Sequence, residues 1–540
     1  MSTLAPLLRQ RLRRDAVQLS IWIGGTTALA ALGSPTVQSS YGDEQERLGL
    51  LATVLANPVI LLFRGLPSGA GEDQMVVFLL LPWLLILAAL MSSFLAVRHT
   101  RGDEEGGRLE LRSATPAGRW LPTAATMIHG ILANVVLGAL VTAVFLGADD
   151  PVAGSVLVGL SCALVGILFF GVALVAAQLM QTSRGANSLA TWVLVVTFVL
   201  AGIGNALGTP SDDLTRMRSS WLTWVSPFGW AENTRAFDED AWGPIALLAV
   251  TAVVLLGAAL ALQAGRDLGG AYVRERAGRA DARGWFSSNG ALVGRLSASA
   301  IVGWVVGGLL SGVLATSLSG VVTQLGTENP AVVDILEKLS GGSDDLERGI
   351  VVVFFVMVGI LAACAGVQAV ARARQDEAAG VAEAVLATPV DLVRWLSAYV
   401  AMGLIAAVLT IAAGVVGALV GAVSATDAGA LARDAVIAGA GQLLPAALFV
   451  GLTAVVFVLA PRLTIALGWV LVALGATIGL FGPLFGMSES VTRLSPFAAA
   501  PAPTASGVDA NGVWWVAAVT VVAVAAALAL MRRRELAAAG

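Results

Sequence analysis

The chain has 540 residues, of which 57% are hydrophobic and 13% are charged, and its formal net charge is −4. No soluble globular protein of this size has that balance. The mean hydropathy of +0.83 predicts an integral membrane protein instead.

Twelve apolar runs are each long enough, at about 20 residues, to cross a bilayer. In the first half, the predicted spans lie near residues 17–37, 75–97, 120–147, 154–181, 189–207 and 244–264. In the second half, they lie near residues 298–320, 350–371, 395–423, 434–460, 464–486 and 512–531. The chain is therefore predicted to form two six-span domains, 1–264 and 298–540, joined by a basic, glycine- and serine-rich cytoplasmic linker at 265–297.

Two segments near the start do not fit a simple span. Residues 4–18 place leucines among four arginines. This pattern is typical of an amphipathic helix in the cytoplasmic membrane interface, or of the positive flank of the first span. Residues 38–74 are polar with a shorter apolar part, which predicts a helix lying against the outer surface.

A polar segment after the second span of each half is repeated. Arg101–Pro116, RGDEEGGRLELRSATP, recurs 273 residues later as Arg374–Pro389, RQDEAAGVAEAVLATP, with eight of sixteen positions identical. Chance would give about one identity at ordinary residue frequencies. Ser226-Pro227-Phe228 likewise matches Ser495-Pro496-Phe497 before the last span of each half. We predict an all-α membrane fold of twelve helices, in which two tandem six-helix repeats are related by a pseudo-two-fold axis along the membrane normal.

Four positions that the two copies share have the spacing of one helical stripe, four, three and four residues apart. The two sets are Asp103, Gly107, Glu110 and Ala114, and Asp376, Gly380, Glu383 and Ala387. The following Thr-Pro is predicted to end the helix, because proline disfavours helical geometry in the residue before it. Small residues in the stripe would let another surface approach closely, which indicates docking; the alternative is a solvated loop helix.

Basic residues indicate the orientation of the chain. Most of the 32 basic residues fall in segments that would share one side of the membrane with both chain ends. By the positive-inside rule that side is the cytoplasm, and both repeated acidic loops lie there. The sequence therefore predicts a multi-pass plasma-membrane protein with cytoplasmic N- and C-termini.

Several kinds of chemistry are excluded by what the sequence lacks. Lys338 is the only lysine, so the phosphate-binding motif G-x-x-x-x-G-K-[ST] is absent and the chain cannot hydrolyse ATP by a P-loop. Cys162 and Cys364 lie in apolar runs and are interpreted as core residues. His99 and His129 are too few and too separated for a metal site, although His129 could pack or line a path within a span. No catalytic set, cofactor or metal is expected in this chain.

Ionisable side chains are also scarce at membrane depth. The predicted spans leave almost no acid, lysine or arginine near a span centre. Ion-coupled transporters keep such groups there as relays or ion ligands. Any uphill transport is therefore expected to draw its energy from outside the chain, and the acidic loops offer an entry point for it.

The run VRHTRGDEEGGRLELRSATPAGR, its second copy, the two Ser-Pro-Phe segments and the six-plus-six plan resemble the fused membrane subunits of actinobacterial ABC exporters. The nearest type is the polyketide-antibiotic exporter, including tetronasin-type permeases. In that family the loop holds the coupling helix, which contacts a separately encoded ATPase subunit that binds ATP and Mg. The resemblance covers nearly the whole chain and implies two ATPase copies as partners, together with membrane lipid and a lipophilic cargo; no nucleic-acid partner is expected.

Carried over by motif, the resemblance assigns eight ATPase-contact residues: Asp103, Glu104, Gly107, Glu110, Asp376, Glu377, Gly380 and Glu383. The second copy departs from the first, because Glu105, Arg108 and Arg112 are replaced by Ala378, Val381 and Val385. The two docking surfaces are therefore expected to be unequal.

The family also implies a cargo path between the halves, lined by the second and fifth spans of each. By position the candidates are Phe78, Trp83, Phe94, Trp192, Phe198, Phe354, Phe355, Met357 and Trp469. Aromatic side chains in spans also pack against helices or lipid, so the alternative for each is a packing role. A mostly apolar path would suit hydrophobic or amphipathic cargo.

The leading hypothesis is the permease subunit of an ATP-driven exporter of such compounds. One alternative is a secondary carrier of the major facilitator kind, which also has two parallel six-span repeats; its corresponding loop would be basic and rich in Gly and Arg. Another alternative is a lipid flippase or a membrane assembly factor.

Overall fold

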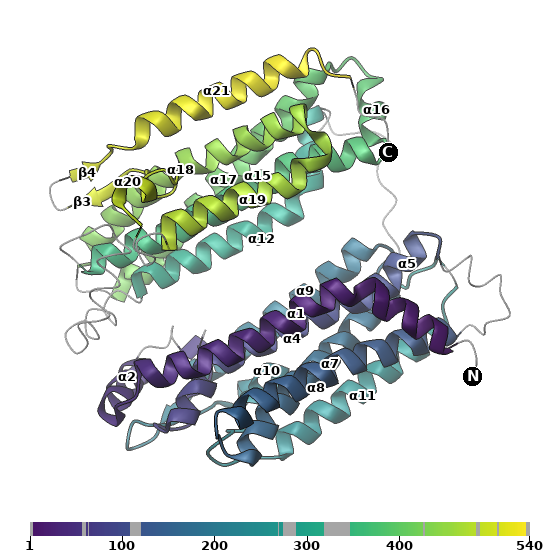
Figure 1. Ribbon diagram of the computed structural model, residues 1–540, viewed down its shortest axis with the longest axis vertical. Coiled ribbons are helices and arrows are strands. Elements are labelled where there is room, and N and C mark those ends of the chain that lie inside the picture. Colours follow the sequence, from purple (N-terminus) through teal and green to yellow (C-terminus); the bar gives the residue numbers. More distant parts are fainter. Residues whose placement is uncertain are drawn as a thin grey trace. The chain divides into compact units, whose positions relative to one another are not determined.

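The computed structural model describes residues 4–56, 61–62, 64–108, 120–267, 269–273, 284, 288–317, 346–424, 427–481, 487–504 and 507–535. Within these residues, twelve helices are long and apolar enough to cross a membrane. The chain is thus an all-α integral membrane protein (Figure 1). It divides into two compact units, Met1–Gly278 and Arg279–Gly540, and the division falls inside the predicted linker.

The first unit holds six of these long helices, with shorter elements at their ends. The long helices are α1 (Leu4–Ser40), α4 (Glu72–His99), α7 (Leu121–Gly147), α8 (Val152–Leu179), α9 (Ser183–Ala206) and α11 (Gly243–Ala264). The short elements are α2 (Glu44–Ala56), α5 (Arg101–Glu105), the 3-10 turn η1 (Trp221–Val225), α10 (Pro227–Glu232) and the antiparallel pair β1 (Thr209–Pro210) and β2 (Met217–Arg218).

The helices α4 and α8 form the centre of the first unit. Leu84, Ala88 and Phe169 are fully buried there. Helix α7 approaches α8 closely at Gly138, where an added Cβ would lie 2.6 Å from the Gly159 carbonyl oxygen. Backbones in lipid associate through such small residues, since no hydrophobic effect drives helices together there.

The start of the first unit differs from one of the two sequence-based interpretations. Helix α1 runs without a break from Leu4 to Ser40, so residues 4–18 extend the first span and do not form a separate interfacial helix. The predicted short helix in 38–74 is present as α2, whose first turn carries Glu44 and Glu46. Arg47 ties α2 to its neighbours by donating to the carbonyl oxygens of Tyr41 and Ala70, each at 2.7 Å.

The second unit holds the other six long helices. They are α12 (Asn289–Ser317), α15 (Leu346–Ala378), α17 (Leu392–Gly421), α18 (Ala428–Leu459), α19 (Thr464–Ala476) and α21 (Val513–Met531). The short elements are α16 (Val381–Leu386), η3 (Ala422–Ser424), η4 (Pro461–Leu463), the π-helical turn η5 (Thr477–Phe481), α20 (Glu489–Thr492) and the antiparallel pair β3 (Ala502–Thr504) and β4 (Gly507–Asp509).

Glycine faces also set the packing of the second unit. Helices α12 and α17 meet at Gly312 and Gly414, where a Cβ on Gly312 would lie 1.8 Å from the Gly414 carbonyl oxygen. Helices α15 and α18 occupy the centre, with Phe355 and Phe457 fully buried. A larger side chain at Gly312 would force the α12–α17 pair apart.

Each unit contains one Ser-Pro-Phe segment, and its serine is hydrogen-bonded to the fifth span. Ser226 donates to the Thr197 carbonyl oxygen at 2.7 Å, and Ser495 donates to the Gly475 carbonyl oxygen at 2.7 Å. The adjacent Phe228 and Phe497 are buried. Each motif therefore fixes the chain against the span that precedes it.

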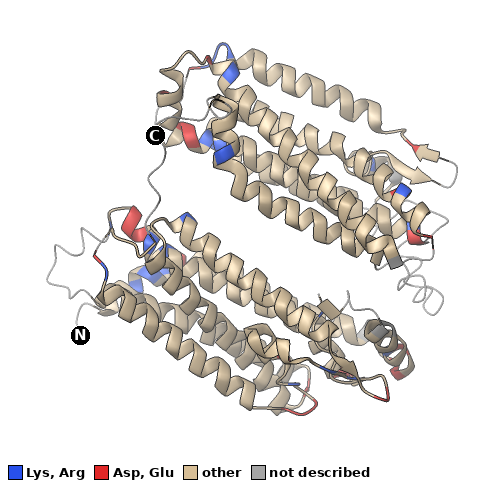
Figure 2. Ribbon diagram, turned by 180° about the vertical axis from the view of Figure 1, so that it is seen from behind, with Lys and Arg blue, Asp and Glu red and all other residues tan. Residues whose placement is uncertain are grey.

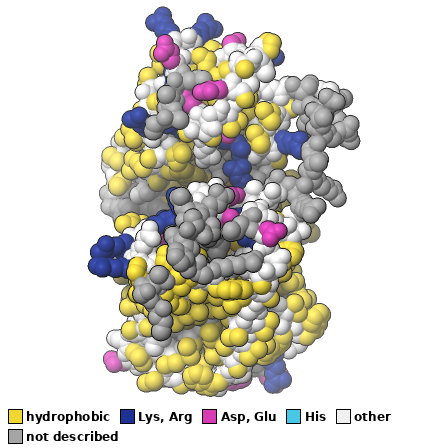
Figure 3. All heavy atoms as spheres, turned by 90° about the vertical axis from the view of Figure 1, so that its right-hand side faces the viewer, with side chains coloured by type: hydrophobic (Ala, Val, Ile, Leu, Met, Phe, Trp, Pro, Cys, Tyr) yellow, Lys and Arg dark blue, Asp and Glu magenta, His cyan; other side chains and the backbone are white. Residues whose placement is uncertain are grey.

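Charge and apolar surface are distributed as a bilayer requires. In Figure 2, acidic and basic residues gather near the ends of the long helices, and the helix middles carry almost none. In Figure 3, hydrophobic side chains cover much of the described surface of each unit. On α11, for example, Val250, Val253 and Val254 are all more than half exposed, which suits contact with lipid.

Candidate functional site

The first repeated loop follows α4 directly. Helix α4 ends at His99, and the short helix α5 places Asp103 and Glu104 in its first turn, where the helix dipole favours acids. Gly107 then adopts a left-handed conformation with φ of 67°. Glu110 lies outside the described residues.

Asp103 points into the first unit. Its side chain is 1% exposed, and its Oδ1 lies 2.8 Å from Arg14 Nη1 and 3.1 Å from Arg108 Nη1. Its Oδ2 lies 3.8 Å from His99 Nδ1, one helical turn earlier. Asp103 therefore joins the loop to α1, through Arg14, and to the end of α4.

Glu104 points toward the end of the sixth span. Its Oε2 lies 2.9 Å from Arg266 Nη2 and 3.0 Å from Arg101 Nη1, and its Oε1 accepts from the Gly269 N–H at 2.5 Å. Arg101 is itself buried and donates to the Ala177 carbonyl oxygen at 3.0 Å. The carboxylate is thus enclosed by two guanidinium groups and a backbone amide.

Glu105 completes the attachment of the first loop. Its carboxylate accepts from the Ser183 N–H at 2.7 Å and also from the Ser183 hydroxyl. Ser183 is the first residue of α9, where unpaired amides and the helix dipole favour a negative charge. The first loop is thereby connected to the fifth span as well as to the sixth.

The second loop has the same core. Helix α15 continues to Ala378, so Glu377 lies in its last turn. One Arg534 nitrogen, Nη2, lies 2.6 and 2.9 Å from the two Glu377 oxygens, and Arg374 Nη1 lies 3.2 Å from Oε2. Arg534 also stacks over the Phe457 ring at 4.4 Å. Arg374, Glu377 and Arg534 are thus arranged as Arg101, Glu104 and Arg266 are.

The surroundings of the neighbouring acid differ in the second loop. Asp376 Oδ2 accepts from the Tyr399 hydroxyl at 2.8 Å and lies 3.5 Å from Arg372 Nε. Gly380 is left-handed, with φ of 72°, and serves as the N-cap of α16. Glu383, in the first turn of α16, is exposed.

The prediction of one helical stripe in each loop is wrong. Gly107 and Gly380 are both left-handed, so each interrupts the helix between the two acids of its predicted stripe, Asp103 and Glu110 or Asp376 and Glu383. Asp103, Glu104 and Glu377 direct their carboxylates into ion pairs of their own unit, whereas Glu383 and Gly380 face outward. The role of these residues as ATPase contacts stays a prediction. The expected helix end at Thr-Pro is confirmed in the second loop, where α16 stops at Leu386.

A shallow pocket lies beside each loop. One, of about 540 Å³, is lined by Gln181, Gly265, Arg266, Asp267, Gly270, Ala271 and Tyr272. The other, of about 590 Å³, is lined by Asp391, Leu392, Val393, Arg394, Ser397 and Arg532. Each pocket contains uncharged polar, acidic and basic side chains, which are suited to contact with a polar protein surface.

The predicted path residues fall into two groups. Phe78 and Phe355 are buried inside their own units, and Phe94, Phe198 and Phe354 are half-buried. The exposed members are Trp83, Trp192, Met357 and Trp469, at 47%, 46%, 38% and 38%. The exposed four come from the second and fifth spans, α4 and α9 in the first unit and α15 and α19 in the second. A path-lining role stays a prediction for all nine.

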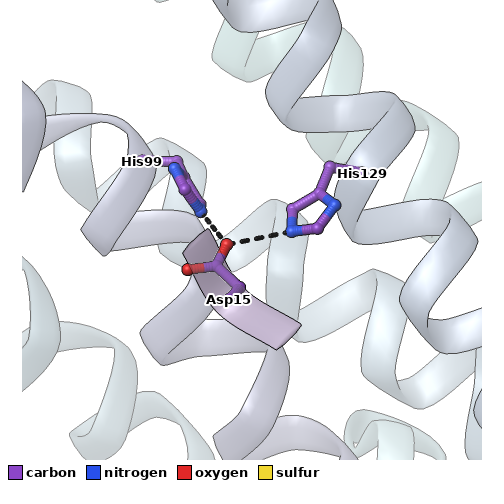
Figure 4. A group of neighbouring side chains, drawn as sticks. All are labelled: Asp15, His99 and His129. Atoms are coloured by element: carbon purple, nitrogen blue, oxygen red, sulfur yellow. Dashed lines mark hydrogen bonds and ion pairs between the residues drawn. The ribbon is translucent and has the colours of Figure 1, made fainter. Parts of the chain in front are cut away.

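A buried cluster that the sequence did not reveal lies next to the first loop. His99 at the end of α4 and His129 in α7 both direct Nε2 at the same oxygen, Oδ2 of Asp15 in α1 (Figure 4). The His129 contact is 3.0 Å, and all three side chains are fully buried. The two histidines are far apart in sequence but adjacent in space, so the argument from their separation is wrong.

The cluster has a donor set that zinc binds, namely two imidazoles and one carboxylate. However, Arg98 Nε lies 3.4 Å from the second oxygen of Asp15, so a guanidinium group already supplies positive charge beside this carboxylate. The cluster therefore joins α1, α4 and α7 through hydrogen bonds to one carboxylate.

Two acids near the opposite ends of the first unit's helices have raised pKa values. Burial, with repulsion from Asp73 and Asp149, raises the pKa of Asp150 to about 7. Burial raises the pKa of Glu232 to about 7 although Asn205 Nδ2 donates to it at 2.7 Å. Both groups exchange protons near neutral pH.

Comparison with known proteins identifies the family. A family model described as the C-terminal domain of the multidrug efflux system permease Rv1217c matches residues 286–532. The chain is also 32% identical over 534 residues to the multidrug efflux system permease protein Rv1217c of Mycobacterium tuberculosis (strain ATCC 25618 / H37Rv), covering 98% of this chain and 94% of that protein. Because the similarity extends over almost the full length of both proteins, the chain belongs to the Rv1217c family of multidrug efflux system permeases.

Proposed function

We propose that this chain is the permease subunit of an ATP-driven exporter that moves hydrophobic or amphipathic compounds out of the cell. The observation that carries the proposal is the full-length similarity to a protein named as a multidrug efflux system permease. Twelve candidate spans and the scarcity of charge along them support a transport role in the membrane. Polyketide antibiotics, including the tetronasin type, are the cargo class that the sequence resemblance implies.

Two copies of a separate ATPase subunit supply the energy in this proposal. With Lys338 as the only lysine, the chain cannot build a P-loop of its own. ATP and Mg are therefore bound by the partner. One ATPase copy docks at each acidic loop, on the cytoplasmic side that also holds both chain termini.

The docking surface at the second loop is formed by the outward face of α16 and the pocket beside it. Val381 is 46% exposed and Glu383 is exposed. At the first loop, the turn at Gly107 is the corresponding feature. Glu110, the sequence equivalent of Glu383, is assigned to the same docking role by the repeat and lies outside the described residues.

Cargo crosses between the two six-span halves in this proposal. Trp83 and Trp192 of the first unit, and Met357 and Trp469 of the second, offer exposed apolar surface on the spans that the resemblance assigns to the path. Large flat side chains suit ring-containing, lipophilic molecules. The buried Phe78 and Phe355 contribute by packing the spans that carry these surfaces.

One observation favours a second candidate, a proton-coupled carrier. The Asp15–His99–His129 cluster is fully buried among three candidate spans, where ionisable groups commonly serve in relays. This reading competes with the ATP-driven one for the source of energy, and the two are separable by experiment.

The test is transport in vesicles that contain the permease with its ATPase partner. Dye or drug movement is followed with ATP, and separately with an imposed proton gradient. ATP-dependent movement that stops with an ATPase-inactive partner and persists with a protonophore supports the proposal. Movement that needs the proton gradient, ignores the ATPase and is lost in His129→Asn replaces it with the carrier. Movement of a fluorescent phospholipid without movement of dye would identify a lipid flippase.

A further inference from the structure

We propose that Arg266 and Arg534 are positioning residues that carry the motion of each loop to the last span of its unit. The proposal rests on the proposed function, because it concerns how an ATPase-driven movement reaches the membrane helices. We call the groups Arg101–Glu104–Arg266 and Arg374–Glu377–Arg534 the first and second latch.

The first latch joins two separate parts of the first unit. Arg101 and Glu104 belong to α5, and Arg266 follows the end of α11 at Ala264. The side chains of Glu104 and Arg266 are 9% and 10% exposed, so water has little access to the pair. Arg266 also donates to the Gly270 carbonyl oxygen, and Arg101 donates to the same oxygen at 3.0 Å. The loop and the end of α11 are thus held by one hydrogen-bonded group.

The second latch repeats this construction with residues from the same places. Arg374 and Glu377 lie in the last turns of α15, and Arg534 follows the end of α21 at Met531. The Glu377 and Arg534 side chains are 1% and 8% exposed. Stacking on Phe457 of α18 fixes the Arg534 guanidinium further. The residues around the two latches differ. In both units, however, the equivalent glutamate, Glu104 or Glu377, pairs with an arginine that follows the sixth span.

Stability alone does not account for these latches. A buried ion pair is often no more stabilising than apolar side chains of the same volume, because both charges lose their water. It does fix one geometry, since several short hydrogen bonds from a planar guanidinium tolerate little displacement. In each unit, that geometry holds the end of the sixth span against the end of the second.

The position of the glycines defines what moves with each latch. Gly107 and Gly380 follow the latch glutamates by three residues, and both are left-handed. A Cβ at either position would meet nothing within 4 Å, so backbone conformation and not crowding requires glycine there. Each loop therefore has an inner part that is fixed to two spans and an outer part that begins at a turn.

A force on the outer part reaches two spans by different routes. The chain itself carries it to α4 or α15, and the latch carries it to α11 or α21. With the latch intact, the second and sixth spans move together as one body, which is the rigid-body motion that transport requires. Without the latch, the loop still binds the ATPase and keeps its other contacts, but the sixth span no longer follows its movement.

The experiment compares Arg266→Gln/Arg534→Gln with wild-type permease in vesicles containing the ATPase partner. Arg493→Gln serves as the matched control, because Arg493 is 47% exposed and lies 3.9 Å from its acidic partner Asp509. Four quantities are measured: the melting temperature, the amount of ATPase that co-purifies, the ATPase rate and the cargo moved per ATP hydrolysed. The last quantity separates transmission of movement from folding and docking.

We expect the double variant to retain its ATPase partner and to move about ten-fold less cargo per ATP, an effect of the size found for residues that couple distant sites. Arg266→Lys/Arg534→Lys, which keeps the charge but loses the planar guanidinium, should fall between the two. An unchanged ratio of cargo to ATP in the Gln variant overturns the proposal. Loss of co-purifying ATPase in step with transport also overturns it, because the arginines would then act in docking.

If the Gln variant does not fold, the Lys variant decides the question. A lower ratio of cargo to ATP at a wild-type melting temperature supports the latch, and a wild-type ratio overturns it. Failure of the proposed function gives a different result, because wild-type permease itself would then show no ATP-dependent transport. That outcome rejects the exporter and the latch together.

Discussion

The two loops keep the same latch but differ in what surrounds it. In the first unit, Asp103 is held by Arg14 from α1 and by Arg108 within the loop. In the second unit, the tie to the first helix is reversed: Arg372 of α15 donates to the Leu296 carbonyl oxygen of α12 at 2.9 Å. The glutamate–arginine contact to the sixth span is therefore common to both units, whereas the contact to the first span is made by different residues in each.

The position equivalent to Arg372 in the first unit is occupied by His99. Each side chain lies one helical turn before the aspartate that it faces, Asp103 or Asp376. Arg372 carries a permanent charge, whereas His99 also contacts Asp15. The first loop is therefore joined to the buried Asp15–His99–His129 cluster, and the second loop, as far as its described residues extend, contains an ion pair at this position.

The largest expected effect separates the inward and outward acids of the second loop. Glu377→Lys should destabilise the second unit by about 3–5 kcal/mol, since it leaves Arg374 and Arg534 facing a third positive charge in a buried site. Glu383→Lys, at an exposed position, should change stability by less than about 0.5 kcal/mol but weaken ATPase association. Melting temperature in detergent and co-purification of the ATPase measure the two effects. A folded Glu377→Lys protein with normal melting would contradict the burial of the latch.

An intermediate effect on stability is expected at the helix ends that lie away from the repeated loops, where the two units differ in their charged residues. In the first unit, Asp150 lies against Asp73, which with burial raises its pKa from 3.8 to about 7. In the second unit, the start of α15 and the start of α18 are joined instead by an ion pair, with Arg348 Nε 3.0 Å from Asp434 Oδ2. The first unit should therefore lose stability as pH rises, and the second should not.

The sign follows from the protons bound in each state. Between pH 3.8 and about 7 the folded state keeps the Asp150 proton that the unfolded state has released, so stability falls through this range and the full loss is present above pH 7. Asp150→Asn should accordingly raise the melting temperature at pH 8 and leave it nearly unchanged at pH 4. Asp434→Asn, the matched change, should lower it at pH 8 because the ion pair with Arg348 loses its negative charge. Equal changes of melting temperature at pH 8 in the two variants would contradict this difference between Asp150 and Asp434.

The smallest expected effect concerns the Ser-Pro-Phe segments. Ser226 donates to the fifth span and also caps α10 by accepting from the Phe228 N–H at 3.2 Å. Ser495 makes the corresponding bond to the fifth span. Ser226→Ala should therefore cost about 1–2 kcal/mol and Ser495→Ala about 1 kcal/mol, as expected for one hydrogen bond with and without a helix cap. Denaturant unfolding with hydrogen exchange at α10 distinguishes them, and a larger loss for Ser495→Ala would reverse the assignment.

The sequence could predict the helices because long apolar runs leave few alternatives in a membrane. The limits of six of the twelve spans lie within three residues of those predicted, as for 120–147 against Leu121–Gly147. Several others extend further than predicted, as for α12, which begins at Asn289 and not at 298. The C-terminal end of the fifth span of the second unit was less predictable. Helix α19 ends at Ala476 and continues as a π-helical turn to Phe481, and 482–486 lie outside the described residues. Hydropathy measures length and does not register such local changes in winding.

The direction of the loop side chains could not be read from spacing. A stripe of Asp103, Gly107 and Glu110 assumes a continuous helix, and a single left-handed glycine breaks that assumption. The buried cluster was missed for a different reason. His99 and His129 are 84 and 114 residues from Asp15, so only the packing of α1 against α4 and α7 brings them together. The one local sign was an aspartate inside an arginine-rich segment that turned out to be part of the first span.

The long helix α1 has a consequence for how the protein is made. Asp15 enters the membrane region with the first helix, but its partner His129 follows 114 residues later. At about 5–20 residues per second, translation leaves this carboxylate without its second imidazole for roughly 6–23 s. The first helix is therefore inserted early, but its buried contacts are completed late. Ribosome-bound chains that stop before His129 should leave Asp15 open to chemical modification, whereas longer chains should protect it.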